Sequence, residues 1–377
     1  MSSNFQGRCT RIFWCGADIQ KLGVGKHMAW NDKKLEQLRA RFDGPNSHVV
    51  YDEHAKYISS LLFDPGGTRR TPPYAGAMTF LDAPAAELTD EALQGLDVAI
   101  IGMPMDLAVT NRSGSRFGPR ALRAVERIGP YNDGLRCAPV QEMKVADVGD
   151  VPFRSRFSLE QSHEDITEAV AKIVTAGALP LSVGGDHSIS LPILRALAKD
   201  GPVGMLHIDA HADTGGPFDG ERFHHGGPFR NAVLEGLLDP ERTVQIGIRG
   251  QSGYLWEFSH ASGMTVIEAQ TLAKSGLDAV IAQALEVVGN GPTYVSFDVD
   301  SLDPSFAPGT GTPEVGGLTP REVIGLLRGM AGMNIVGGDV VEVAPSYDAT
   351  SNTAQNAATV LFEILSLMKF RNQTLSS

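Results

Sequence analysis

The chain has 377 residues, with 32 Lys and Arg against 44 Asp and Glu, which gives a formal net charge of −12. Hydrophobic residues make up 42% and charged residues 20%, so the chain can bury a sizeable core and is not disordered as a whole. The acidic balance and the lack of a basic cluster argue against nucleic acid or an anionic membrane as a partner. Small solutes, cationic ones above all, fit this charge better.

The cysteine content and the apolar pattern point to a reducing compartment. Three cysteines, Cys9, Cys15 and Cys137, are too few for a disulfide framework. The first residues lack the apolar run of a signal peptide, and no stretch reaches the roughly 20 apolar residues of a membrane span. We therefore expect a cytoplasmic protein without a membrane partner.

The first 70 or so residues differ in pattern from the rest of the chain. They contain two helical patterns, near residues 32–42 and 53–63, and these are followed by a cluster of glycines and prolines at residues 64–73. Such a cluster is typical of a boundary between structural units. We interpret residues 1–70 as an N-terminal extension and residues 71–377 as one larger domain.

From residue 96 onward, short β-branched runs alternate with longer amphipathic stretches, which is typical of βαβ units in a parallel sheet. The predicted strands are 97–101, 143–148, 179–183, 204–211, 243–248, 264–267, 293–300 and 335–343. The predicted helices are 159–176, 189–198, 272–288, 319–330 and 353–368, with Ser158 and Thr319 as N-caps. Because the strands are continuously apolar, we expect an α/β protein with helices on both faces of its sheet.

Histidines and aspartates gather where three of these strands are predicted to end. The six residues with side chains suited to metal binding are His187, Asp209, His211, Asp213, Asp298 and Asp300. In the run HIDAHAD the acidic and imidazole side chains recur at every second residue, so an extended backbone would project them from one face. His207 shares that spacing but lies deeper in the strand, and we interpret it as a core histidine.

Four carboxylates close together would repel one another unless cations neutralise them. Two histidines and four aspartates are too many for one tetrahedral zinc site, but they suit two divalent ions that share bridging carboxylates. With one imidazole for each ion, this oxygen-rich set favours Mn²⁺, with Ni²⁺ or Co²⁺ as alternatives and zinc less favoured. The sequence therefore predicts two divalent metal ions per subunit, Mn²⁺ or Ni²⁺.

Three motifs resemble the signatures of the ureohydrolases, the arginase and agmatinase family. They are HIDAHAD at 207–213, SFDVDSLDP at 296–304 and GGDH at 184–187, and the similarity extends from about residue 71 to about residue 368. The resemblance implies a three-layer α/β/α sandwich with a mostly parallel sheet of about eight strands. It further implies that one metal ion is bound by His187, Asp209, Asp213 and Asp298. The other would be bound by His211, Asp209, Asp298 and Asp300.

The same resemblance implies a hydrolase that cleaves a C–N bond of a guanidino compound. In such a site a water between the two ions is acidified and attacks the guanidinium carbon, with Asp300 accepting or orienting its proton. His225 resembles a loop histidine that shuttles a proton to the leaving amine. Glu342 matches the carboxylate that pairs with guanidinium nitrogens. His224 is either a second proton carrier, a wall of the substrate pocket or an exposed loop residue, and Asn111 either lines the pocket or supports a turn.

The substrate is predicted from loops around this constellation. Residues 110–116, 129–132 and 145–151 look closer to the guanidinobutyrase, guanidinopropionase and guanidine hydrolase branch than to agmatinase proper. The predicted substrate is guanidine, a short guanidino acid, or an N-alkyl guanidine or biguanide, which gives urea or a urea derivative plus ammonia or an amine. Agmatinase, which converts agmatine to putrescine and urea, is the alternative.

Two further readings are less favoured by the residues present. They are a deacetylase-like amidohydrolase and a non-catalytic partner subunit, and retention of all six ligand positions argues against both. Because ureohydrolases usually form trimers or hexamers, the resemblance also predicts a homo-oligomer, and a hetero-oligomer with a related subunit stays open. The N-terminal extension is expected to contact a neighbouring subunit.

Overall fold

The computed structural model describes residues 31–43, 53–62, 75–126, 128–250 and 253–372. The chain divides into two compact units, Met1–Ser59 and Ser60–Ser377. Helices α1 (Asp32–Phe42) and α2 (Glu53–Leu62) lie close to the predicted positions, and Asn31 caps α1 by accepting from the amide of Lys34. The Gly and Pro cluster, the boundary near residue 70, Cys9 and Cys15 lie outside the described residues, so that boundary stays a prediction.

The larger unit is built on a sheet of eight strands, all of which pair in parallel. The strands are β1 (Val98–Met103), β2 (Val145–Asp150), β3 (Leu179–Gly184), β4 (Val203–Ile208), β5 (Leu238–Ile248), β6 (Thr265–Glu268), β7 (Thr293–Asp298) and β8 (Ile335–Val341). Their order is β2-β1-β3-β8-β7-β4-β5-β6. The predicted parallel sheet of eight strands is confirmed.

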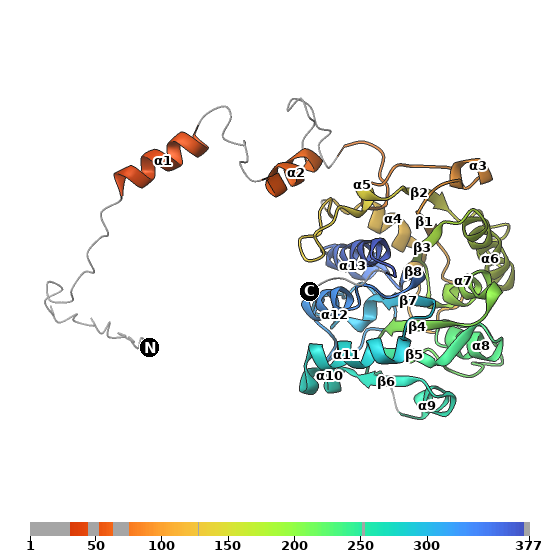
Figure 1. Cartoon of the computed structure of the whole chain (residues 1–377). Coiled ribbons are helices and arrows are strands. Elements are labelled where there is room, and N and C mark those ends of the chain that lie inside the picture. Colours follow the sequence, from red (N-terminus) through yellow and green to blue (C-terminus); the bar gives the residue numbers. More distant parts are fainter. Residues whose placement is uncertain (1–30, 44–52, 63–74, 127, 251–252, 373–377) are drawn as a thin grey trace, which may run out of the picture. The chain divides into compact units, whose positions relative to one another are not determined.

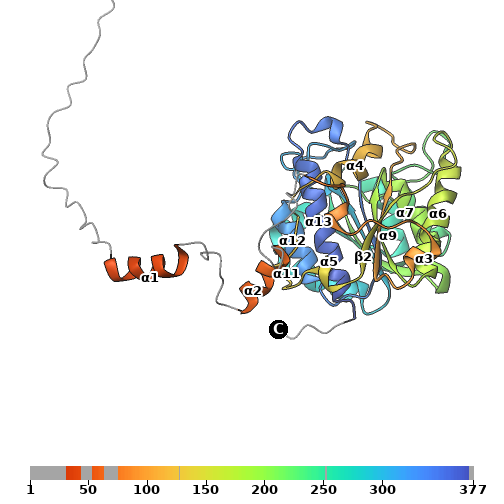
Figure 2. The same cartoon turned by 90° about the horizontal axis from the view of Figure 1, so that it is seen from above.

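Helices cover both faces of this sheet, which makes three layers (Figures 1 and 2). Those on one side are α10 (Ala269–Ser275), α11 (Leu277–Val288), α12 (Pro320–Gly329) and α13 (Asn352–Lys369). The main helices on the other side are α6 (Leu159–Thr175), α7 (Ser190–Leu197) and α8 (Pro228–Leu234). The shorter ones are α3 (Asp90–Leu93), α4 (Gly118–Arg123), α5 (Pro139–Glu142) and α9 (Glu257–Ser262). Two clusters of buried apolar side chains, one on each face of the sheet, form the core of the α/β/α sandwich.

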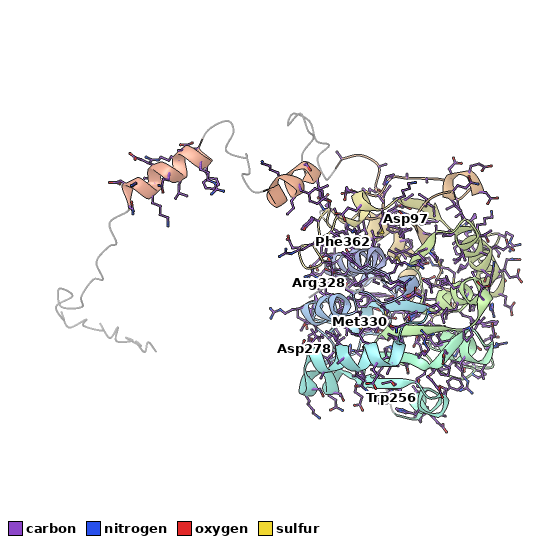
Figure 3. All side chains as sticks on the ribbon, in the orientation of Figure 1. Asp97, Trp256, Asp278, Arg328, Met330 and Phe362 are labelled. Carbon is purple, nitrogen blue, oxygen red and sulfur yellow. The ribbon has the colours of Figure 1, made fainter. Side chains whose placement is uncertain are left out.

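Local sequence signals account for where α6 and α12 begin. Ser158 accepts from the amide of Gln161 at the start of α6, as predicted. Thr319 and Glu322 form a capping box before α12. The single helix predicted over 272–288 is wrong, because Gly276 adopts a φ of +82° there and separates α10 from α11. Figure 3 marks the position of Arg328 on α12. Its guanidinium forms an ion pair at 2.5 Å with the buried carboxylate of Glu363 on α13.

The centre of the sheet brings together the strand ends that carry the predicted site. Strands β3, β8, β7 and β4 are consecutive neighbours, and Ile208 is in register with Phe297, which is in register with Val340. Because all four strands run in the same direction, the loops that follow them meet at one edge of the sheet.

None of the helices formed by the described residues combines the length and apolar character needed to cross a membrane.

Candidate active site

The loop after β4 carries three of the predicted ligands. The strand ends at Ile208, earlier than expected, and the amide of His211 donates to Oδ1 of Asp209 at 2.6 Å. Asp213 has a φ of +51°, so the backbone turns instead of staying extended. The side chains therefore converge through a turn and not through the period of a strand, which corrects the geometric reason given for their common direction.

In the loop after β7, a turn likewise brings the candidate side chains together. Asp298 ends the strand and caps the 3₁₀ turn Val299–Ser301, accepting from the amide of Asp300 at 2.7 Å. Oδ1 of Asp300 in turn accepts from the amide of Ala210 at 3.2 Å, which joins the two loops. The hydroxyl of Thr312 donates to the other oxygen of Asp300 at 3.1 Å. Sequence reasoning missed Thr312, which lies in the loop that begins near residue 308.

A buried imidazole nitrogen faces three carboxylates at the centre of this edge. Nδ1 of His187 lies 2.9 Å from Asp213, 3.1 Å from Asp209 and 3.3 Å from Asp298. Although His187 is fully buried, this nitrogen has no hydrogen-bond partner of acceptable geometry. Three oxygens and one imidazole nitrogen converging on one point without hydrogen bonds between them are the donor set of a cation site.

The other nitrogen of His187 fixes its tautomer. Nε2 lies 2.8 Å from the hydroxyl of Ser296, and that hydroxyl donates to Asp339 at 2.8 Å. Since the hydroxyl proton is committed to Asp339, Ser296 accepts from Nε2–H and Nδ1 keeps its lone pair. Asp339 also accepts from Tyr294 and Ser190, each at 2.5 Å, so its position is tightly held. Sequence reasoning missed both Ser296 and Asp339, although Ser296 precedes Asp298 by two residues on the same strand face.

A second group of candidate ligands shares Asp209 with the first. Nδ1 of His211 lies 3.1 Å from Oδ2 of Asp300 and 3.6 Å from Oδ1 of Asp209. Asp209 thus presents one oxygen to His211 and the other to His187, as a bridging carboxylate would. Burial, together with the charges of Asp300 and Asp209, raises the pKa of Asp298 well above its ordinary value. Carboxylates this close together stay ionised only if positive charge neutralises them. The six residues fit two divalent cations.

His207 is buried and hydrogen-bonded, as its interpretation as a core histidine requires, but it also contacts the site. Its Nδ1 accepts from the side-chain amide of Gln245 at 3.0 Å. Its Nε2 therefore carries the proton and lies 2.8 Å from Oδ2 of Asp209. His207 thus holds the carboxylate that both groups of ligands share, a contact that the sequence did not reveal.

Glu342 lies immediately after β8 in a left-handed conformation, with a φ of +63°. Its side chain is 1% exposed. Oε1 accepts from the amide of His187 at 2.9 Å and lies 2.8 Å from Nδ1 of His225. Oε2 is buried and has no partner among the described residues. An unpaired buried carboxylate oxygen is costly, so Glu342 is suited to a ligand with N–H donors and positive charge.

His225 lies between Glu342 and Thr110. Its Nε2 is 3.1 Å from the amide nitrogen and 2.7 Å from the hydroxyl of Thr110. Burial opposes the charged imidazolium, but the carboxylate of Glu342 outweighs it and raises the pKa of His225 to about 9. The amide of Thr110 favours an unprotonated Nε2, whereas its hydroxyl can accept from a protonated one. His225, which lines the pocket, can therefore take up or release a proton at Nε2.

The remaining two predicted residues have different surroundings. His224 is buried, and its Nε2–H donates to the carbonyl of Gly216 at 2.8 Å, so it is not an exposed loop residue. Asn111 is exposed, and its amide donates to the carbonyl of Gly311 at 3.1 Å. Asn111 is absent from the linings of the two hollows described below, and its contact supports the turn.

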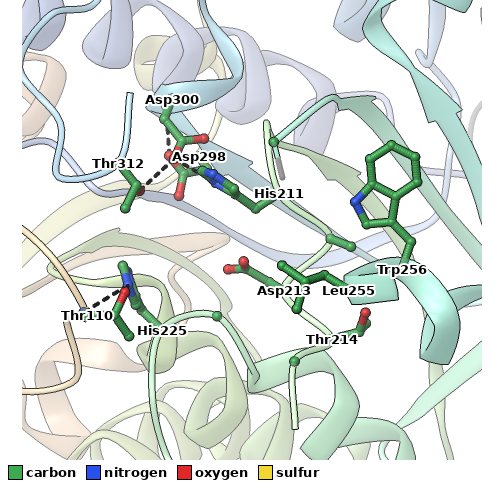
Figure 4. Close-up of a pocket in the computed structure, with 14 residues that line it drawn as sticks. Thr110, His211, Asp213, Thr214, His225, Leu255, Trp256, Asp298, Asp300 and Thr312 are labelled. Atoms are coloured by element: carbon green, nitrogen blue, oxygen red, sulfur yellow. Dashed lines mark hydrogen bonds and ion pairs between the residues drawn. The ribbon is translucent and has the colours of Figure 1, made fainter. Parts of the chain in front are cut away.

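A pocket of about 110 Å³ lies at the carboxyl edge of the sheet and is lined by some of these side chains. Its lining includes Thr110, His211, Asp213, His225, Trp256, Asp298, Asp300 and Thr312. Figure 4 shows His225 and Thr110 across the pocket from Asp298 and Asp300. A wider hollow of about 690 Å³ adjoins it and is lined by His224 among others. We call these the inner pocket and the outer chamber.

The parallel sheet and the paired His and Asp groups at its carboxyl edge define an α/β protein with a candidate centre for two divalent cations. A model of the arginase family matches residues 96–366, more than half of the chain. The chain belongs to the arginase family. The resemblance inferred from its three motifs is thereby confirmed.

Individual relatives give the same family. The chain is 48% identical over 276 residues to the mitochondrial guanidino acid hydrolase of Homo sapiens, covering 72% of this chain and 78% of that protein. It is 44% identical over 312 residues to the guanidinobutyrase of Pseudomonas aeruginosa, covering 81% and 97%. The solved structure of the proclavaminate amidino hydrolase from Streptomyces clavuligerus superposes with a TM-score of 0.74 at 36% identity, covering 79% and 99%.

Proposed function

We propose that the protein is a binuclear metal hydrolase that cleaves a C–N bond of a small guanidino compound to urea, or a urea derivative, and ammonia or an amine. The observation that carries the proposal is the unpaired, buried Oε2 of Glu342 beside a donor set for two cations. A guanidinium group supplies both the charge and the planar N–H donors that this oxygen lacks. The names of the relatives, which include a guanidino acid hydrolase and a guanidinobutyrase, support the same reaction class.

The metal assignment is part of this proposal. His187, Asp209, Asp213 and Asp298 would hold one ion, and His211, Asp209, Asp298 and Asp300 the other. Two divalent ions held there would lower the pKa of a bound water and so would supply hydroxide at neutral pH. The carboxylate-rich donor set favours Mn²⁺, and Ni²⁺ is the alternative.

The chain's own side chains then carry binding and proton transfer. Oε2 of Glu342 receives the guanidinium N–H groups and orients the guanidinium carbon toward the cation centre. Asp300, held by Thr312 and by the amide of Ala210, accepts or orients the proton of the attacking water. Nε2 of His225 delivers a proton to the leaving nitrogen, which departs as a neutral amine or as ammonia.

Agmatine is the second candidate substrate, and one observation favours it. Glu257 is exposed and lines the outer chamber, where it could meet the ammonium tail of agmatine. A deacetylase-like amidohydrolase and a non-catalytic partner subunit remain less favoured, because each would dispense with part of the six-residue donor set.

The test is reconstitution of the metal-free protein with Mn²⁺ and with Ni²⁺ separately. Urea and amine release would be measured from guanidine, 3-guanidinopropionate, 4-guanidinobutyrate, agmatine, arginine and a dimethylbiguanide. We expect about two bound ions per chain and turnover of at least one of the small guanidino compounds. One ion per chain would contradict the binuclear assignment, and two ions without any turnover would contradict the reaction class.

We further propose a cytoplasmic homo-oligomer, a trimer or hexamer, in which residues 1–70 contact a neighbouring subunit around the catalytic domain of residues 71–377. A hetero-oligomer with a related subunit is the alternative. Light scattering on the full chain and on a chain lacking residues 1–70 would test this proposal. An unchanged assembly with unchanged activity would reject the role given to the extension.

A further inference from the structure

The outer chamber opens directly onto the inner pocket. The two hollows share the lining residues Thr110, Thr214, Gly215, Gly226 and Leu255. The inner pocket, at about 110 Å³, has room for little more than a guanidinium group, whereas the outer chamber has about 690 Å³. A substrate whose head is held by Glu342 would therefore extend its tail into the outer chamber.

The walls of the outer chamber are aromatic, and they carry one permanent positive charge. Phe218, Tyr254 and Phe258 contribute the rings, and Arg230 contributes the charge. Among the described residues that line the chamber, Glu257 is the only carboxylate, and it is exposed at the first residue of α9. A substrate tail in the chamber would thus meet two opposite charges. Arg230 is partly buried, whereas Glu257 is exposed to solvent.

The guanidinium of Arg230 is held in place by contacts that leave its N–H donors unpaired by any carboxylate. Its central carbon lies 4.9 Å from the centre of the Phe258 ring. A Cβ added at Gly216 would lie 3.3 Å from Nη1, so the guanidinium also packs on the backbone of the loop after β4. Among the described residues, no carboxylate lies within ion-pair distance of Arg230, whereas the neighbouring Arg195 and Arg222 both pair with Glu235.

We propose that Arg230 binds the carboxylate of the substrate's tail, so that the preferred substrate is a guanidino acid. This inference rests on the proposed function and narrows its substrate class. A guanidinium stacked on an aromatic ring keeps its edge free for bidentate hydrogen bonds to a carboxylate. An ammonium tail in the same place meets a like charge, and a tail-less guanidine leaves Arg230 unused.

The experiment compares substrates that share a guanidinium head but differ in their tails. The ratio of kcat/KM for 4-guanidinobutyrate to that for agmatine is measured on the metal-loaded full chain, with guanidine as a third substrate. We expect the wild type to prefer 4-guanidinobutyrate. Arg230→Met should lower that ratio at least about tenfold, chiefly through KM for the acid, because a charge-assisted bidentate contact is lost. Arg230→Glu should lower it further by attracting the ammonium tail.

Two further variants separate this role from general damage. Arg156→Met removes another arginine that lies over a phenylalanine ring, but on an exposed segment outside both hollows, and it should leave the ratio within about twofold. Gly216→Ala keeps Arg230 but presses a methyl group against its Nη1, so the ratio should fall in the same direction by a smaller factor.

The following results would contradict the role proposed for Arg230. A wild type that prefers agmatine, or a ratio that Arg230→Met and Arg230→Glu leave unchanged, would overturn the inference while the proposed hydrolase activity stands. An equal fall of the ratio in Arg156→Met would overturn it too. A wild type that binds two metal ions but hydrolyses none of the three compounds would overturn the inference. If it also left 3-guanidinopropionate, arginine and a dimethylbiguanide intact, the proposed function would be refuted as well.

Discussion

Replacing Ser296 by alanine should weaken metal binding without removing a ligand. The Ser296 hydroxyl is the partner of Nε2–H of His187 and donates in turn to Asp339. In Ser296→Ala, Nε2–H is left in a fully buried site without an acceptor, which costs about 1–3 kcal/mol. The ring can avoid that cost by moving its proton to Nδ1, where three carboxylates lie, but Nδ1 must then be deprotonated before it binds a cation.

Either response reduces affinity for the ion at His187. Loss of an outer hydrogen-bond partner of a metal ligand typically lowers affinity about 10–100-fold, which corresponds to about 1.4–2.7 kcal/mol and agrees with the desolvation cost. The assay is competition of each protein with a metal chelator for Mn²⁺, followed spectroscopically. We expect weakening of one of the two ions, because His211 has no contact with Ser296 among those that the structure records.

A matched control is available in the same sheet. Ser182 is fully buried on β3, but its hydroxyl has no hydrogen-bond partner among the described residues. Ser182→Ala should therefore leave Mn²⁺ affinity within about twofold, since no hydrogen bond is lost. If Ser296→Ala retains wild-type affinity for both ions, or if Ser182→Ala weakens binding equally, the argument that Ser296 fixes the His187 tautomer is refuted.

Three further predictions follow from the geometry. Asp209→Ala should abolish both metal ions and turnover, because its two oxygens face His187 and His211 separately, and elemental analysis with urea release would check this. Glu342→Gln should keep two ions but lose at least about 100-fold in kcat/KM for a guanidino substrate, since a neutral amide replaces a charge-assisted bond. Burial lowers the pKa of His163 to about 4, so its neutral form is favoured in the folded state and stability is lost as pH falls from about 6.5 toward 4. Between pH 7 and pH 5 this amounts to about 2 kcal/mol, and denaturant unfolding of His163→Gln should show a pH dependence weaker by that amount.

Contrary results are equally specific. Full metal content in Asp209→Ala would exclude its bridging position, and near wild-type turnover in Glu342→Gln would move the guanidinium contact elsewhere. Parallel pH profiles of stability for the wild type and His163→Gln would show that His163 is not held neutral in the folded protein.

The residues of the site could be found from the sequence, but their arrangement could not. Asp209, His211 and Asp213 stand out because their types and spacing are rare, whatever the backbone does. The turn that unites them depends on the left-handed conformation of Asp213, which Asp adopts more readily than most residues but which the alternating pattern of this run does not indicate. The break in the helix predicted over 272–288 could have been anticipated, because Gly276 is a sequence signal for the end of a helix. The prediction gave more weight to the continuous helical pattern.

Contacts between side chains on different strands could not be predicted from the sequence, for a related reason. The hydrogen bond from His187 to Ser296 joins residues 109 positions apart. Predicting it requires the strand order β3-β8-β7-β4, whereas periodicity identifies strands without ordering them. The same holds for Thr110 and His225, whose loops are distant in the chain and adjacent only in the folded sheet.

The position of β8 has a consequence for how the protein is made. The last strand of the chain lies at the centre of the sheet, between β3 and β7, and it delivers Glu342. During synthesis, the position between β3 and β7 stays unfilled until β8, which ends at Val341, has left the ribosome. Because β3 and β7 are not direct neighbours, His187, which follows β3, depends on β8 for its place beside Asp298 at the end of β7. We therefore expect a product truncated before residue 335 to lack both the strand that joins β3 to β7 and the carboxylate of Glu342, whereas the loops after β4 and β7 would still follow directly paired strands.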